Sequence, residues 1–120
     1  MERVLEPRKL LEVEELGVDR NAGADQAVRA FAAWAEARIV KWIQFPRGVL
    51  LFLMVPGDPE SGHFYLLDRP KRTFYELNVE GDARWGGYGQ DEFDELTDSL
   101  SLKQLAERPR DLRSFAGGRL

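Results

Sequence analysis

The stretch that most suggests chemistry is "DARWGGYGQDEFDEL", residues 82–96, in which glycines run into an acidic helical pattern. A phosphate loop places glycines before a helix because the free N–H groups and the positive dipole end at the helix N-terminus bind an anion. The first turns of the expected helix carry four acidic residues: Asp91, Glu92, Asp94 and Glu95. These carboxylates interact with the same dipole and repel a phosphate, so we do not expect phosphate binding here.

The three glycines are better explained as parts of a connector. Their positions, Gly86, Gly87 and Gly89, fit neither the dinucleotide fingerprint nor the Walker pattern. Glycine adopts positive φ without strain, which a sharp loop needs. We expect Trp85 and Tyr88 to pack against neighbouring structure. A partner-contact loop is the alternative, because tryptophan and tyrosine are enriched in interface hot spots.

Acidic side chains are concentrated between Glu76 and Asp98, where eight carboxylates accompany one arginine and the net charge is −7. This segment attracts divalent cations, but the alternating Asp and Asn positions of a calcium loop are absent. The acids of the helix are more simply a solvated face. We therefore expect neither a metal nor a cofactor.

Side chains that could catalyse a reaction are few. The chain has no cysteine, which excludes disulfides, thiolate nucleophiles and cysteine-ligated metal sites. His63 is the only histidine, so a two-histidine zinc site is impossible, and no serine lies in a GxSxG elbow. The sequence thus leans against an enzyme.

Composition and charge indicate one globular domain. With 43% hydrophobic residues the chain is too apolar for a disordered protein. A net charge of −4 gives no overall attraction to nucleic acid or to an anionic membrane. The longest apolar run, "VLLFLMV", has seven residues, whereas a membrane-spanning helix needs about 20. The charged start "MERVLEPRKL" lacks the apolar core of a secretory signal, so we expect a cytoplasmic protein that binds neither nucleic acid nor membrane.

The elements that position these residues predict an α+β fold, a four-stranded antiparallel β-meander packed with N-terminal and C-terminal α-helices. Four strand-like segments, "IVKWIQF", "VLLFLMV", "HFYLLD" and "TFYELNV", follow one another with turn sequences between them. No helix-length segment separates them, so neighbouring strands must run antiparallel. We expect residues 1–108 to form a single domain and residues 109–120 a basic, partly ordered tail that can pair with the acidic stretch.

Helices are expected before and after these strands. Residues 25–38 predict a helix with one apolar stripe: Ala27, Phe31, Trp34 and Ala35. Residues 6–17, "EPRKLLEVEELG", favour a short helix, although Leu11 and Val13 alternate with glutamates as they do in a strand. Residues 90–100 predict a helix, and a further turn can follow at 101–106.

The register of the last hairpin follows from a symmetric "RPKR" turn. One face then pairs Leu66 with Tyr75, and the other pairs Leu67 with Phe74. The second face becomes polar at one end, where four residues form a candidate ligand site: His63, Tyr65, Glu76 and Asn78.

The strand "VLLFLMV" is apolar on both sides, which is expected when both faces of the sheet are covered. Helices on opposite sides provide one explanation. A partner protein or a second copy against the spare face provides another, and a small-molecule cleft a third. The candidate partner-binding residues are Leu53, Leu67, Phe74, Trp85 and Tyr88.

The back half of the chain, with a strand ending in "YLLD", a turn, a second strand and the acidic "DEFDEL" helix, resembles the end of the SUKH immunity superfamily. Members of that superfamily bind and neutralise partner toxins. The front half has no counterpart of the family's glycine-bearing entry region. The resemblance therefore implies a protein-binding role from the back half alone.

These patterns favour a small, non-enzymatic, cytoplasmic binding domain that acts through protein–protein contacts, with a protein partner or as a homodimer. The alternative is a small-ligand or catalytic pocket around His63, at the polar end of the second sheet face.

Overall fold

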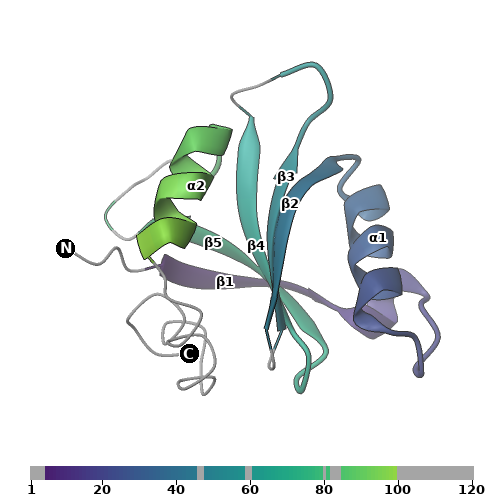
Figure 1. Cartoon of the computed structure of the whole chain (residues 1–120). Coiled ribbons are helices and arrows are strands. Elements are labelled where there is room, and N and C mark those ends of the chain that lie inside the picture. Colours follow the sequence, from purple (N-terminus) through teal and green to yellow (C-terminus); the bar gives the residue numbers. More distant parts are fainter. Residues whose placement is uncertain (1–4, 46–47, 59–60, 80, 82–84, 100–120) are drawn as a thin grey trace.

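The computed structural model describes residues 5–45, 48–58, 61–79, 81 and 85–99. Within them, an antiparallel sheet of five strands lies between two α-helices (Figure 1). The elements in chain order are β1 (Leu5–Glu12), the 3-10 helix η1 (Val13–Leu16), α1 (Ala24–Trp34), β2 (Arg38–Phe45), β3 (Gly48–Met54), β4 (Gly62–Asp68), β5 (Thr73–Val79) and α2 (Gln90–Ser99). The expected α+β class and antiparallel sheet are confirmed, and the sheet has one strand more than predicted.

The meander from β2 to β5 forms as the turn sequences predict. Each strand pairs with the next, and the sheet order is β1-β5-β4-β3-β2. In the last hairpin Leu66 pairs with Tyr75 and Leu67 with Phe74, which confirms the predicted register. The "RPKR" sequence lies between Asp68 and Thr73, where β4 ends and β5 begins. Turn chemistry and alternation were therefore sufficient to set this pairing.

The helix expected over residues 6–17 is wrong. Strand β1 occupies most of this segment and pairs antiparallel with β5, and only η1 is helical, with Gly17 following at a φ of 71°. Strand β5 has an edge to which the alternating residues of β1 can add, and this pairing outweighs the helical pattern. Pro7 is tolerated because β1 is an edge strand, where an N–H can be absent from the outer side.

Helix α1 covers one face of the sheet. The buried residues of this α1-side core come from β1, η1, α1 and the three central strands: Leu11, Val13, Ala27, Val28, Phe31, Ala32, Val49, Leu51, Leu53, Tyr65, Leu67 and Phe74. Phe31 anchors the helix, because its ring stacks on Phe74 with centroids 4.2 Å apart and meets Tyr65 edge-on at 4.9 Å. Trp34 departs from the predicted apolar stripe and is largely exposed.

Helix α2 covers the opposite face (Figure 1). The buried residues of this α2-side core are Leu50, Phe52, Met54, Phe64, Leu66, Leu77, Tyr88 and Phe93. Phe93 is the contribution of α2, and its ring lies 5.0 Å from that of Phe52. Strand β3 is buried along its whole length because its residues alternate between the two cores.

The doubly apolar sheet is thus accounted for within one chain. Leu53, Leu67 and Phe74, expected as partner contacts, are 1%, 2% and 0% exposed beneath α1. Helix α1 already removes these three side chains from water, and a contact between them and a partner stays a prediction. The turn expected at 101–106 and the basic tail at 109–120 lie outside the described residues. No helix in the described part of the chain is long and apolar enough to cross a membrane.

Candidate functional site

The polar end of the α1 side brings together three of the four predicted ligand-site residues. The carboxylate of Glu76 lies opposite Tyr65 in the ladder, and its Oε2 is 3.1 Å from Nδ1 of His63. The His63 and Tyr65 rings are near-parallel with centroids 6.0 Å apart. Glu76 is buried, whereas the side chain of His63 is 32% exposed. The strand register therefore predicted this grouping correctly.

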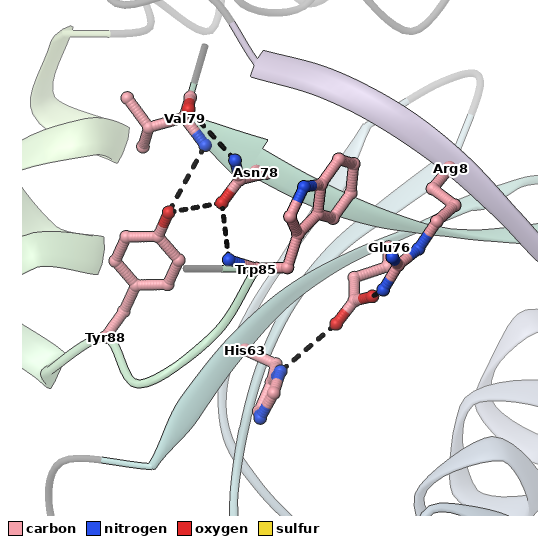
Figure 2. Close-up of polar contacts among 7 residues, drawn as sticks. All are labelled: Arg8, His63, Glu76, Asn78, Val79, Trp85 and Tyr88. Atoms are coloured by element: carbon pink, nitrogen blue, oxygen red, sulfur yellow. Dashed lines mark hydrogen bonds and ion pairs between the residues drawn. The ribbon is translucent and has the colours of Figure 1, made fainter. Parts of the chain in front are cut away.

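Arg8 of β1 completes this cluster and was missed from the sequence. Its guanidinium forms an ion pair with Oε1 of Glu76 and lies over the Trp85 ring, 4.3 Å from the centroid (Figure 2). Arg8 pairs with Glu76 because β1 runs antiparallel to β5 in that register. Because residues 6–17 were expected to form a helix, the contact between Arg8 and Glu76 could not be predicted. No other feature of the sequence links these two residues.

Two opposing effects act on the ionisation of Glu76. Burial by itself raises the pKa of this carboxyl, but the hydrogen bonds from His63 and Arg8 and the positive charge of Arg8 outweigh it. The pKa of Glu76 is consequently held below its ordinary value. The pKa of Tyr65 is raised, first by burial and then by the neighbouring Glu76 carboxylate, so its hydroxyl stays protonated.

Asn78, the fourth predicted residue, belongs to a separate network. Its Oδ1 accepts hydrogen bonds from the Tyr88 hydroxyl at 2.6 Å and from the Trp85 N–H at 3.1 Å (Figure 2). The β4–β5 ladder stops at Phe64 and Leu77, so Asn78 does not pair across to His63. Asn78 is fully buried and fastens the glycine-rich stretch to the end of β5.

The glycine-rich stretch serves as a connector, as the sequence indicated. Tyr88 forms an isolated bridge with Gly62, with both backbone hydrogen bonds at 2.9 Å, and thereby extends the sheet beside β4. Gly86 has a φ of 141°, and a Cβ there would lie 2.2 Å from Cε1 of His63. Only glycine fits so close to the imidazole. Tyr88 is 1% exposed and Trp85 is half-buried, so both pack against the chain itself.

The chemistry open to this cluster is narrow. Both oxygens of Glu76 are engaged, one by His63 and one by Arg8. An imidazole that donates from Nδ1 to a carboxylate keeps Nε2 as an acceptor. The cluster is a polar network closed among Arg8, His63 and Glu76.

A different surface is left apolar and open. Three large hydrophobic side chains are exposed among the described residues: Trp34 at 57%, Trp42 at 41% and Val55 at 45%. Each belongs to the edge strand β2 or to a segment that adjoins it in the chain or in the sheet. Trp42 is part of it, Trp34 ends the helix that leads into it, and Val55 directly follows Met54, the partner of Arg38. Sequence reasoning missed this surface because it placed Trp34 in the buried stripe and did not identify β2 as an edge.

Metal ligands do not converge in the described part of the chain, where no group of three or more His, Asp or Glu side chains could hold an ion. Two cavities are lined by residues outside the His63 cluster, one beside the start of α1 and one beside Arg38. Comparison with known proteins finds no family model, no curated protein and no solved structure that matches this chain, so the resemblance to the SUKH superfamily gains no support.

Proposed function

We propose that this chain is a small, non-enzymatic binding domain that recognises a partner protein through strand β2. The contact region, called the β2 surface below, consists of the exposed apolar residues Trp34, Trp42 and Val55. The single observation that carries the proposal is that the large hydrophobic side chains exposed among the described residues all belong to the edge strand β2 or to segments that adjoin it. Exposed apolar side chains that are grouped rather than scattered mark interaction sites.

The backbone and the side chains of β2 both support a protein ligand. Strand β2 is an outer strand of the sheet, and no other described strand pairs with its free side. Tryptophan is the residue most enriched in interface hot spots, because one side chain buries a large apolar area. Trp42 lies on the α1 side of β2, since it pairs with Leu51 of the α1-side core. Trp34 belongs to α1 and therefore lies on the same side of the sheet.

The occupant is a different protein rather than a second copy of this chain. Lys41 lies near the middle of β2, and the register shifts between Ile39 and Lys41. Lysines and bulges on an edge strand oppose pairing with an identical strand, because they place like charges together and twist the edge away. The basic residues of β2, Arg38 and Lys41, pair with Met54 and Phe52 of the α2-side core and so lie on the face opposite Trp42, where Lys41 forms an ion pair with Asp94. A partner with an apolar patch therefore complements the β2 surface.

The alternative, a ligand or catalytic pocket around His63, has less support. Glu76 is engaged by Arg8 and His63, and Asn78 fastens the connector, so these polar groups are directed at the chain itself. These polar groups hold segments of the chain in place and are not directed at a ligand site.

Site-specific photo-crosslinking tests the proposal. A photo-reactive amino acid replaces Trp42 in one protein and Lys9, on the opposite edge strand β1, in a control protein. Each protein is expressed in cells of the organism from which the chain comes. There we expect the protein with the crosslinker at position 42 to give an adduct of one defined mass, and the protein with the crosslinker at position 9 to give none. Introducing Trp34→Ser into the protein with the crosslinker at 42 should remove most of that adduct.

The mass of the crosslinked adduct distinguishes a different protein from a second copy of this chain. An adduct at the mass of two copies, together with a dimer in native mass spectrometry of the purified chain, would replace the foreign partner by a second copy. The same adducts from positions 9 and 42, or an adduct that survives Trp34→Ser unchanged, would reject the β2 surface.

A further inference from the structure

A cavity of about 420 Å³ lies between the start of α1, η1 and the turn that joins β4 to β5. These three segments lie at the same end of the sheet (Figure 1). The volume is within the range of about 300 to 1,000 Å³ that small-molecule sites occupy. The cavity is separate from both the β2 surface and the His63 cluster.

The cavity has an apolar wall and a positively charged wall. Val13, Ala27 and Leu67, which are buried members of the α1-side core, supply apolar lining. Arg69 and Arg72 supply two positive charges from the β4–β5 turn. None of the described residues that line the cavity is acidic. An apolar lining beside paired guanidinium groups suits an organic anion.

Backbone hydrogen bonds hold the two arginines in place. The N–H of Arg72 donates to the carbonyl of Arg69 at 3.2 Å and closes the turn. The carbonyl of Arg72 accepts from the N–H of Val13 at 2.9 Å, which ties the turn to η1. The cationic wall and the apolar wall are thus joined before any ligand arrives, and a preorganised site binds with less loss of conformational entropy.

The charges near the cavity leave room for an added anion. Glu14 binds Arg72 through Nε only. The terminal Nη2 of Arg72 is shielded from solvent and has no hydrogen-bond acceptor in the described chain. Arg69 is exposed and forms no ion pair with a described residue. A buried donor without an acceptor is unfavourable, and an oxyanion can satisfy it after a small rotation of the flexible guanidinium.

We propose that this cavity binds a small organic anion, with a carboxylate or phosphate group on Arg69 and Arg72 and an apolar body against Val13, Ala27 and Leu67. The guanidinium fork matches both oxyanions, because each presents two oxygens to parallel N–H groups. This site does not depend on the β2 surface, and the two can be tested separately.

Titration followed by amide NMR signals tests the site on the full chain. The probes are phenyl phosphate and benzoate, which share an apolar ring, and benzyl alcohol, which has the ring without the charge. We expect one or both anions to shift the signals of Val13, Ala24 and Ala27 saturably at concentrations up to about 10 mM, where a site with an affinity of about 1 mM is mostly filled. Benzyl alcohol should leave these signals unchanged.

Matched arginine variants identify the contacts. Arg69→Gln should weaken the anion at least about tenfold, because a charge-assisted hydrogen bond is lost. Arg20→Gln removes the same charge from an exposed residue that does not line the cavity, and should change the affinity less than about twofold, as expected for a screened charge. Arg72→Lys keeps the charge but not the fork and should give an intermediate loss.

Each result decides the proposal. A response to phenyl phosphate alone assigns the head group as phosphate, and a response to benzoate alone assigns it as carboxylate. The absence of a saturable shift with either anion, or equal affinity in the Arg69→Gln and Arg20→Gln proteins, overturns it. Both variants change exposed residues, and the dispersion of the remaining NMR signals verifies that each is folded.

Discussion

Single residues decide how the glycine-rich stretch joins the sheet. Asn78 satisfies two donors of this stretch at once, the Tyr88 hydroxyl and the Trp85 N–H, in a fully buried position. Gly86 provides the space that His63 occupies. The position of the connector therefore depends on the amide side chain of Asn78 and on the absence of a side chain at Gly86. Each residue can be changed separately.

Asn78→Ala removes an acceptor that two groups share. We expect a loss of about 2 to 4 kcal/mol in the free energy of unfolding, because the Tyr88 hydroxyl and the Trp85 N–H lose their partner in a buried site. Tyr88→Phe removes one of these two donors together with the weaker acceptor of the Val79 N–H, 3.4 Å away, and should cost less, about 1 to 2 kcal/mol. Urea denaturation of both variants measures the difference, and equal losses would show that Asn78 does not act through these two bonds.

Gly86→Ala places a methyl group against the imidazole of His63. We expect a loss of about 1 to 3 kcal/mol in unfolding free energy from overpacking, in addition to the strain of positive φ. Gly57→Ala is the control, because Gly57 also has positive φ but open space around its Cβ position. In the His63→Ala background the Gly86→Ala loss should shrink toward that of Gly57→Ala. An unchanged loss would mean that the contact with His63 is not the cause.

Glu76 links stability to pH. Its pKa is lowered in the folded chain, so the unfolded state binds the proton more readily and protonation favours unfolding. The stabilisation is complete above the unfolded value of about 4.3 and is lost as the pH falls through the lower folded pKa. The difference in unfolding free energy between wild type and Glu76→Gln should therefore be largest near neutral pH and shrink below about pH 4.3. A difference that grows toward acid pH would contradict a lowered pKa.

At the scale of elements, the sequence predicted the parts whose signal is local. Alternation and turn chemistry gave β2 to β5, and the "RPKR" turn gave the register that pairs Tyr65 with Glu76. Helix α1 followed from its apolar stripe, although it ends at Trp34 and residue 38 of the predicted helix begins β2, and α2 followed from the spacing before and after Phe93. The candidate cluster of His63, Tyr65 and Glu76 follows from that register alone.

The parts that failed depend on contacts between distant segments. Strand β1 carries both helical and strand signals, and only the free edge of β5 decides between them. Arg8 could not be assigned to Glu76 before that pairing was known. Asn78 was placed beside His63 because nothing local shows that Tyr88 takes the position beside Gly62 instead. These outcomes are set by tertiary structure, which overrides propensity.

Helix α1 offers a direct comparison between a core residue and a surface residue three positions apart. Phe31 is fully buried against Phe74 and Tyr65, whereas Trp34 is 57% exposed. Phe31→Ala should reduce the unfolding free energy by about 3 to 5 kcal/mol. Trp34→Ala should cost less than about 1 kcal/mol, because it loses little more than its stacking on Phe31. Thermal unfolding compares them, and equal losses would place Trp34 in the core rather than on the β2 surface.

At the scale of the whole molecule, two helices on opposite faces close the sheet. The α1-side and α2-side cores share strand β3, whose residues alternate between them. In the described part of the chain, helices cover both faces of the sheet, and each of the outer strands β1 and β2 has one side that no strand pairs with. The proposed recognition of a partner at the edge strand β2 can therefore be separated by mutation from the stability of the chain.

Leu53 and Val55 make this separation testable within three residues. Leu53 is 1% exposed beneath α1, and Val55 is 45% exposed just past the end of β3. Leu53→Asp should unfold the isolated chain, because burying an unpaired carboxylate costs more than a small domain's stability provides. Val55→Asp should leave circular dichroism and the unfolding midpoint nearly unchanged while reducing the crosslink from position 42. If Leu53→Asp were folded and merely lost a partner, the α1-side face would be an interface between molecules, and the closed arrangement of the two cores would be wrong.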